Sequence, residues 1–150
     1  MDQYKSFHCI NAMQLQAQWI VGFVDGEGCF HIGIHKNQKL ALGYQVLPQF
    51  TVVQHERDIN VLYALKNFFQ CGVVRRNHGN LWCYRVRSIH HLHESILPFF
   101  EKHKLKTQKN INFLKFRRVI FLMKKGEHLT QQGFERIQKI QSQMNKNKSI

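Results

Sequence analysis

The spacing of apolar residues divides the chain into predicted strands and helices. Strict alternation of apolar and polar positions predicts a strand, because successive side chains of a strand point to opposite faces. Such alternation covers residues 30–35 and 81–87 and, with interruptions at Leu47 and Pro48, residues 44–52; a shorter strand is predicted around residues 73–77. Apolar residues spaced three or four apart predict helices at residues 11–24, 58–69, 89–100, 107–124 and 130–146. The predicted element order is therefore α-β-β-α-β-β-α-α-α.

Two pairs of strands separated by a helix predict one antiparallel sheet. A doubly wound parallel sheet would need a crossover between neighbouring strands, and the short turn at His78–Asn80 leaves no room for one. The helices are expected on one face of the sheet, which leaves the other face open. The fold class is therefore α+β. From its length we expect a single domain of residues 1–150, with residues 1–10 as an N-terminal extension and residues 147–150 as a frayed end.

The outward positions of the predicted strands are mainly polar or basic. Arginine and glutamine side chains hydrogen-bond to base edges, and arginine also pairs with phosphates. A sheet face that is merely solvated is the alternative, because antiparallel sheets often have one. We predict instead that this face binds double-stranded DNA. The expected contacts are His31, His35, Gln45, Gln49, Thr51, Arg75, Asn77, Arg85 and Arg87.

The net charge strengthens this prediction. The chain has 22 Lys and Arg against 9 Asp and Glu, a net charge of +13. Residues 1–74 carry five basic and five acidic side chains, so the whole excess follows Val74. Such an excess in a folded chain favours a polyanion, with nucleic acid ahead of an anionic membrane surface. No apolar run reaches the roughly 18 residues of a membrane span and no signal peptide is evident, so we expect an intracellular protein with no membrane partner.

Cysteine and histidine spacing gives no sign of a zinc site or a disulfide framework. The four cysteines contain no CxxC pair, and we expect them to be reduced thiols. The cluster His90, His91 and His93 has no cysteine beside it, and neighbouring residues on a helix point to different sides. We expect these histidines at the surface or near DNA.

Two carboxylates stand in the otherwise apolar segment WIVGFVDGEGCFHIGI, residues 19–34. Asp25 and Glu27 follow the first predicted helix, for which Asn11 is the expected N-cap. Gly26 and Gly28 are expected to turn the chain with positive φ. The C-terminus of a helix carries partial negative charge and disfavours acids. Another group must therefore compensate for the two carboxylates.

The segment IVGFVDGEG, residues 20–28, resembles the LAGLIDADG motif of homing endonucleases. Glu27 stands at the second acid, although the motif is named for an aspartate there. The element order, Gln54 at the end of the second strand and the lysine-rich KHKLKTQK after LPFF fit the same family, so the resemblance covers nearly the whole chain. It implies an αββαββα fold whose curved antiparallel sheet forms a DNA-binding saddle, with further C-terminal helices. The other matching motif positions are Gly22, Asp25, Gly26 and Gly28.

The resemblance also implies an activity. It predicts an intron-encoded endonuclease that makes a metal-dependent double-strand break in a long pseudopalindromic DNA site and leaves 3′ overhangs. The metal is expected at Glu27 and Gly26, with Mg²⁺ as the ion and Mn²⁺ or Ca²⁺ as other occupants. Family habit implies an organellar location, in a chloroplast or mitochondrion. The alternative is a maturase that binds intron RNA and assists splicing without cleaving DNA.

Further roles follow from the resemblance, residue by residue. Gln54 matches the position that orients metal-bound water. Lys106 matches the position that supports the nucleophile or stabilises negative charge, and Lys104 and Lys109 are rivals for it. Asp25 resembles the structural acid of the family, which caps backbone N–H groups of the motif turn or of a neighbouring helix.

The chain has one copy of the motif, whereas monomeric members of the family have two. We therefore expect a homodimer with C2 symmetry. Glycines at positions 22 and 26 would allow the two motif helices to approach closely. The two copies of Glu27 would then meet, and divalent ions would offset their repulsion and the unfavourable helix end. The expected interface residues are Val21, Gly22, Asp25 and Gly26.

Overall fold

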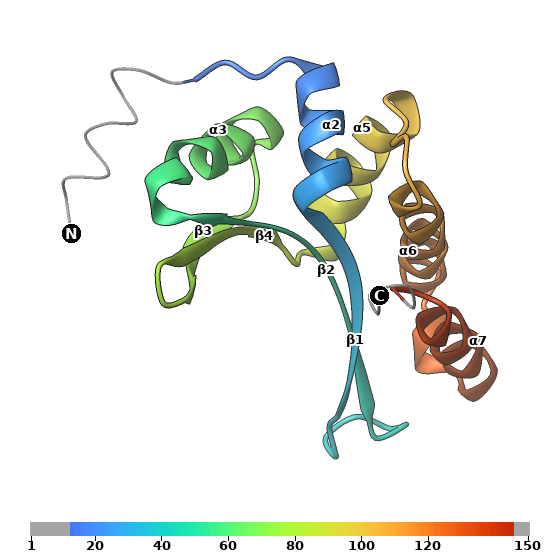
Figure 1. Cartoon of the computed structure of the whole chain (residues 1–150). Coiled ribbons are helices and arrows are strands. Elements are labelled where there is room, and N and C mark those ends of the chain that lie inside the picture. Colours follow the sequence, from blue (N-terminus) through green and yellow to red (C-terminus); the bar gives the residue numbers. More distant parts are fainter. Residues whose placement is uncertain (1–12, 146–150) are drawn as a thin grey trace.

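The computed structural model describes residues 13–145, and its element order confirms the predicted one (Figure 1). The short elements η1 and η3 are 3-10 helices, and η2 is a π-helical turn between α4 and α5. The elements are α2 (Ala17–Glu27), β1 (Gly28–Lys36), β2 (Tyr44–His55), η1 (Glu56–Asp58), α3 (Ile59–Phe69), β3 (Val73–His78), β4 (Leu81–Val86), α4 (Ile89–His91), η2 (Leu92–Ile96), α5 (Leu97–Lys102), α6 (Lys109–Lys124), η3 (Glu127–Leu129) and α7 (Gln131–Ser142).

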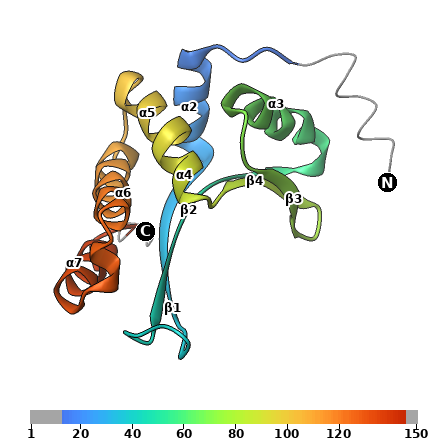
Figure 2. The ribbon, with the colours of Figure 1, turned by 180° about the vertical axis from the view of Figure 1, so that it is seen from behind.

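The four strands form one antiparallel sheet in the order β1-β2-β4-β3. The sheet is strongly curved, and the helices lie on one side of it (Figures 1 and 2). No element of residues 13–145 covers the other side. The predicted α+β class, with a curved sheet open on one face, is confirmed. Within the described part of the chain, no helix is long and apolar enough to cross a membrane.

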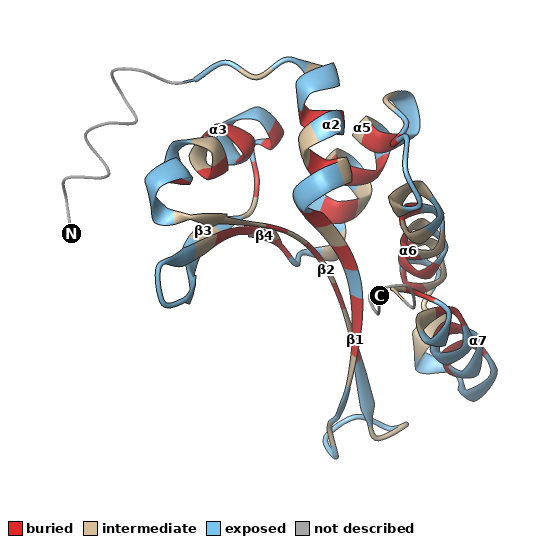
Figure 3. Cartoon of the chain, viewed as in Figure 1, coloured by how far each residue is buried: buried red, intermediate tan, exposed pale blue. Residues whose placement is uncertain are grey.

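The hydrophobic core lies between the sheet and the helices (Figure 3). Phe30 of β1 is 1% exposed and lies at its centre. Its ring centroid is 5.1 to 5.6 Å from those of four other phenylalanines, which come from β2, α5 and α6. These rings are Phe50, Phe100, Phe113 and Phe116.

Helix α7 and the residues after it protect the outer edge of β1. The side-chain amide of Gln141 donates to the carbonyl oxygen of Ile32 at 3.1 Å, and that of Asn145 donates to the carbonyl oxygen of Phe30 at 3.1 Å. Asn145 is itself held by hydrogen bonds with Asn112 of α6. Because unpaired strand edges invite pairing with other chains, these amides take up acceptors that an edge strand would otherwise expose.

The first helix begins later than predicted. It starts at Ala17, with Gln16 at the N-cap position and no side-chain cap, and residues 13–16 are not helical. The expected N-cap, Asn11, lies outside the described residues. The apolar residues Met13 and Leu15 alternate with glutamines, and this two-residue spacing does not place them on one helical face.

The same helix also ends later than predicted. It includes Asp25 and Gly26 and ends at Glu27, and the expectation of positive φ at Gly26 and Gly28 is wrong. Gly28 has φ −81° and ψ 162°, so the helix leads directly into β1. Position 28 requires glycine for lack of space instead, because a Cβ atom there would lie 2.6 Å from Cγ1 of Val24.

We predict that Phe30→Ala lowers the free energy of unfolding by about 3–5 kcal/mol, because it leaves a cavity among four rings. Urea unfolding followed by circular dichroism measures this change. The matched control is Phe68→Ala, since Phe68 is 40% exposed and the same truncation should cost much less there. Equal losses from the two variants would contradict the placement of Phe30 at the centre of the core.

Candidate functional site

The carboxylate of Asp25 joins the end of α2 to the segment that precedes α6. Its Oδ2 accepts the backbone N–H of Lys106 at 2.7 Å. Its Oδ1 accepts the backbone N–H of Thr107 at 3.2 Å and the hydroxyl of Thr107 at 2.8 Å. Hydrogen bonds to a charged acceptor are stronger than neutral ones, so this contact fixes the position of Lys106 beside the motif. The structure thus gives Asp25 the capping role expected of it.

Lys109 supplies the charge compensation that the helix end requires. The last turn of α2 contains no basic residue, but the ammonium group of Lys109 donates to the carbonyl oxygen of Val24 at 3.1 Å. A cation at this position offsets the partial negative charge of the helix C-terminus. The ammonium of Lys109 therefore has a structural contact, whereas Lys104 and Lys106 are exposed. Sequence reasoning missed this role because the two residues are 85 positions apart.

Glu27 is exposed at the end of α2. Its carboxylate has no hydrogen-bond or ion-pair partner among residues 13–145. Gly26 belongs to the same last turn, whose carbonyl groups lack intrahelical partners. A carboxylate and a backbone carbonyl are oxygen donors of the kind that Mg²⁺ and Ca²⁺ accept, so these residues fit the expected metal. In the described part of the chain, no cluster of three His, Cys, Asp or Glu side chains could complete a metal site.

Gln54 lies near the end of β2, beyond the start of β1. Val52 pairs with Gly28, the first residue of β1, so Gln54 extends past β1 toward the end of α2. Its partner on the other side is Trp82 of β4. The side chain is half-buried. The strand register therefore brings Gln54 to the same end of the sheet as Glu27.

The surface of α2 carries exposed aromatic and glycine positions. Trp19 is 44% exposed, and its ring stacks on that of Phe23 with centroids 4.8 Å apart. Gly22 and Gly26 are exposed on the same helix. Val21 differs from the expectation that it contributes to an interface, because it is only 2% exposed and packs in the core of its own chain. The sequence could not predict which apolar residues of this helix face the core, because every one of them is compatible with burial.

The open face of the sheet gathers the predicted contact residues. Most core-facing neighbours along β1, β2 and β4 are buried, as the alternation predicts, whereas β3 at the sheet edge has no buried residue. Register sets Thr51 opposite Arg85, Gln45 opposite His35 and Gln49 opposite His31. Asn77 lies at an irregularity of the pairing between Arg76 and His78, so it has no partner on β4. The exposed residues are His31, His35, Gln45, Arg75, Asn77 and Arg87, and the half-buried ones are Gln49, Thr51 and Arg85.

Positive charge is concentrated on this face and is not balanced by acids. None of the open-face positions of the four strands is Asp or Glu. Burial, and then the charges of Arg87 and Arg75, lower the pKa of Arg85. The buried Nε atom of Arg85 has no hydrogen-bond partner in the described chain. Burial raises the pKa of Cys83 although the same arginines oppose this, so its thiol is neutral at pH 7. The face therefore carries cationic donors and no carboxylate that would balance their charge.

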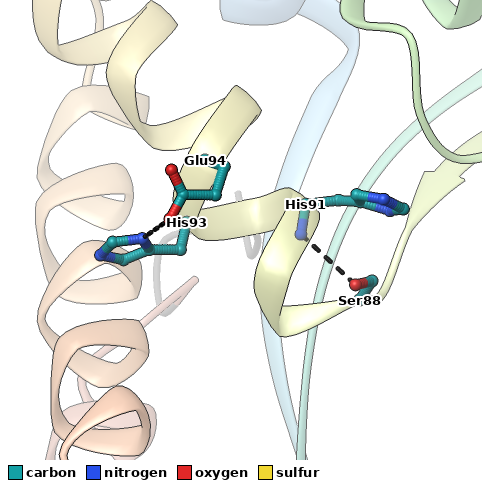
Figure 4. A network of polar contacts seen from close by, with 4 residues as sticks. All are labelled: Ser88, His91, His93 and Glu94. Carbon is teal, nitrogen blue, oxygen red and sulfur yellow. Dashed lines mark hydrogen bonds and ion pairs between the residues drawn. The ribbon is translucent and has the colours of Figure 1, made fainter.

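The histidine cluster lies on α4 and η2, which follow β4 (Figure 4). The backbone N–H of His91 donates to Oγ of Ser88 at 3.3 Å, which caps α4. The Nδ1 atom of His93 is 2.9 Å from Oε1 of Glu94, and this hydrogen bond lowers the pKa of Glu94. The rings of His91 and His93 point to opposite sides. The cluster thus has local structural contacts.

The fold and the site together define a class of protein. It is an α+β protein with a curved antiparallel sheet, one open basic face, and an acidic helix end beside that sheet. Residues 20–120 match the family model described as LAGLIDADG endonuclease. The chain belongs to this family, and the resemblance seen in the sequence is confirmed.

Several curated relatives are named as intron-encoded endonucleases. A probable intron-encoded endonuclease of Neurospora crassa is 32% identical over 120 residues, which are 79% of this chain and 25% of that protein. DNA endonuclease I-CvuI of Chlorella vulgaris is 27% identical over 105 residues, 68% of this chain and 65% of that protein. The chain spans about a quarter of the length of several curated relatives that it matches.

Solved structures share the fold. The crystal structure of the homing endonuclease I-TnaI is 52% identical with a TM-score of 0.87, and the match covers 90% of this chain and 91% of that one. The meganuclease I-SmaMI bound to uncleaveable DNA is 37% identical with a TM-score of 0.88. That match covers 89% of this chain but 46% of the I-SmaMI chain, so this fold corresponds to about half of I-SmaMI.

We predict that Asp25→Asn lowers the free energy of unfolding by about 1–3 kcal/mol, because the amide group removes the charge and faces N–H donors with its own. Thr107→Val is the control: it removes the hydroxyl that donates to Asp25 and accepts the backbone N–H of Lys109, but it leaves both backbone hydrogen bonds to Asp25, so its loss should be smaller, about 1 kcal/mol. Urea unfolding of both variants gives the two values. An unchanged stability in Asp25→Asn would show that the contact does not hold the segment.

Proposed function

We propose that this protein is a site-specific homing endonuclease encoded within an intron, which makes a metal-dependent double-strand break in a long pseudopalindromic DNA site and leaves 3′ overhangs. The observation that carries the proposal is the uncovered basic sheet face, together with the exposed Glu27 at the end of the helix that leads directly into β1. Curvature and the absence of acids on that face suit a polyanionic duplex. The printed names of relatives, among them DNA endonucleases and a DNA-bound meganuclease, support the same activity.

The proposed metal is Mg²⁺, held by the carboxylate of Glu27 and the backbone carbonyl of Gly26. Such an ion would stabilise charge on the attacking and leaving oxygens of the phosphodiester. Ca²⁺ is expected to support binding without cutting, and a structure of I-SmaMI with an uncleaved target in the presence of calcium ions is consistent with this. Mn²⁺ is a further candidate with similar oxygen ligands.

Two other side chains complete the proposed site. Lys106 is placed beside the motif by the bond of its backbone to Asp25, and its ammonium would stabilise negative charge that develops at the phosphate. Of the three candidate lysines it is favoured over Lys109, whose ammonium contacts Val24. Gln54 lies at the same end of the sheet, where its amide would orient the attacking water.

The proposed assembly is a homodimer joined through α2. A glycine within a helix costs about 0.5–1 kcal/mol relative to alanine. Nothing among residues 13–145 explains this cost at Gly22 or Gly26, because a Cβ atom at either would have no atom within 4 Å apart from the adjacent residues and the backbone of its own helix. A second helix packed closely against them would explain it. The exposed Trp19 would then be covered by the partner chain, and each half of the dimer would read one half-site.

An intracellular, organellar setting belongs to the same proposal, and relatives named for ND4 intron 1 and for cox1 intron 2 are consistent with an intron origin. A splicing role with intron RNA is not favoured by the comparisons. An RNA-first protein would bind structured intron RNA more tightly than duplex DNA at matched salt.

Cleavage tests the activity. A binding site is first selected from randomised duplexes in Ca²⁺, cloned into a plasmid, and then incubated with the protein and Mg²⁺. We expect one double-strand break in the wild type, none with EDTA, and a rate at least about 100-fold lower in Glu27→Gln, because the metal loses its carboxylate. Glu56→Gln, an exposed acid outside the motif, is the matched control and should cut normally. Specific binding with no cleavage in any divalent ion would refute the nuclease activity.

Glycine substitution tests the assembly. Gly22→Ala and Gly26→Ala should leave the folded chain as stable or more stable, by up to about 1 kcal/mol, yet weaken self-association because each methyl group separates the paired helices. Sedimentation velocity measures the mass of the particle, and urea unfolding at low concentration measures the chain. Gly28→Ala is the contrasting variant, since its clash with Val24 should destabilise the chain itself. A wild type that remains monomeric at all concentrations would exclude the homodimer.

A further inference from the structure

Gln49 of β2 and Arg87, the residue after β4, form a contact across the open face. Nε of Arg87 donates to Oε1 of Gln49 at 3.1 Å. Register explains the contact, because Phe50 pairs with Val86 and the preceding and following residues therefore meet. On the other side of β2, Gln49 pairs with His31 of β1. The pair thus lies in a row that runs across three strands.

This hydrogen bond decides what the two side chains can offer to a ligand. A free glutamine has a carbonyl acceptor and an amide donor, the combination that recognises adenine in the major groove. Here the side-chain carbonyl of Gln49 accepts from Arg87, so only the amide N–H₂ group of Gln49 is left to bind a ligand. Arg87 keeps the four N–H groups of its two terminal nitrogens. Together they present donors to the open face, and the ligand must supply acceptors.

Among the bases, guanine fits such a pair. Its major-groove edge carries two acceptors, N7 and O6, which match the two terminal nitrogens of a guanidinium held end-on. A phosphate would also accept these donors. The inner position of the pair favours a base, because Gln49 is half-buried on a strand that has neighbours on both sides, whereas the phosphates of a groove follow its edges.

We propose that Gln49 and Arg87 act as one unit that reads a guanine in each half-site, with Arg87 as the contacting residue and Gln49 as the residue that orients it. This inference rests on the proposed function, since it assigns a base to a side chain on the same DNA-binding face. It differs from a set of independent contacts, because the two side chains specify the same base pair. Held in place before binding, Arg87 loses less conformational freedom when it meets the base.

The neighbouring row provides an internal control. Arg85 faces Thr51 across the sheet, and its Nε has no partner in the described chain. It is an arginine on the same face, two residues before Arg87, that has no glutamine opposite it. Arg85→Lys should therefore change discrimination at a different base pair, or none, and Gln49→Leu should not affect that position.

The experiment measures duplex affinity in Ca²⁺ for the selected target and for the three other bases at every position. We expect a guanine at one position of each half-site, with 5- to 150-fold discrimination, about the range of a bidentate contact. Arg87→Lys and Gln49→Leu should each relax discrimination at that position alone. The double variant should be no worse than Arg87→Lys. Gln49→Glu, which keeps an acceptor for Nε, should retain the guanine preference.

The outcomes separate this inference from the function beneath it. If the two single variants change discrimination at different base pairs, Gln49 and Arg87 do not act as one unit. If Arg87→Lys lowers affinity equally for all four bases, Arg87 is a phosphate contact. In both cases the protein remains a sequence-specific DNA binder. If the wild type shows no sequence preference at all, the proposed function is wrong, and so is the inference that Gln49 and Arg87 read a guanine.

Discussion

The contact between Asp25 and the segment before α6 is the constraint on which the site depends. One carboxylate accepts hydrogen bonds from Lys106 and Thr107, residues more than 80 positions away in the sequence. Lys109 adds a second link to the same helix end through the carbonyl of Val24. These links fix the end of α2 against α6 and leave Glu27 as the acid that points to solvent. The motif therefore contains two acids with separate roles, one used within the chain and one available to a ligand.

The sheet could be predicted closely because its signal is local. Alternation along β1 and β2 assigns each residue to a face, and the short turn at residues 78–80 determines how β3 and β4 meet. The core face and the open face of the sheet could therefore be predicted from the alternation. Phe30, Phe50 and Tyr84 are buried as this pattern requires. The boundaries of α2 were harder to predict, because an apolar segment such as residues 19–24 is equally compatible with a helix, a strand or an interface.

The parts that could not be predicted are pairings between distant residues. Nothing near Lys109 in the sequence indicates that its ammonium contacts a carbonyl of α2. The bond between Gln49 and Arg87 likewise depends on the register of β2 with β4, which places residues 38 positions apart side by side. The expectation that Val21 lies at the dimer interface differs from the structure for a related reason: the motif predicts the helix, but only packing against the core decides which side of the helix is buried. Residue type suggested the chemistry, and three-dimensional contact assigned the roles.

The amide groups of Gln141 and Asn145 have a consequence for anyone who shortens or fuses this chain. They occupy the carbonyls of Ile32 and Phe30 on the outer edge of β1, and Asn145 is the last described residue. A protein cut before Gln141 would retain every proposed catalytic residue but would present a long strand with an unpaired edge. Such an edge is a template for intermolecular pairing, so the shortened protein would be lost to aggregation rather than to damage at the site. The C-terminal segment is thus needed for a chain that stays in solution.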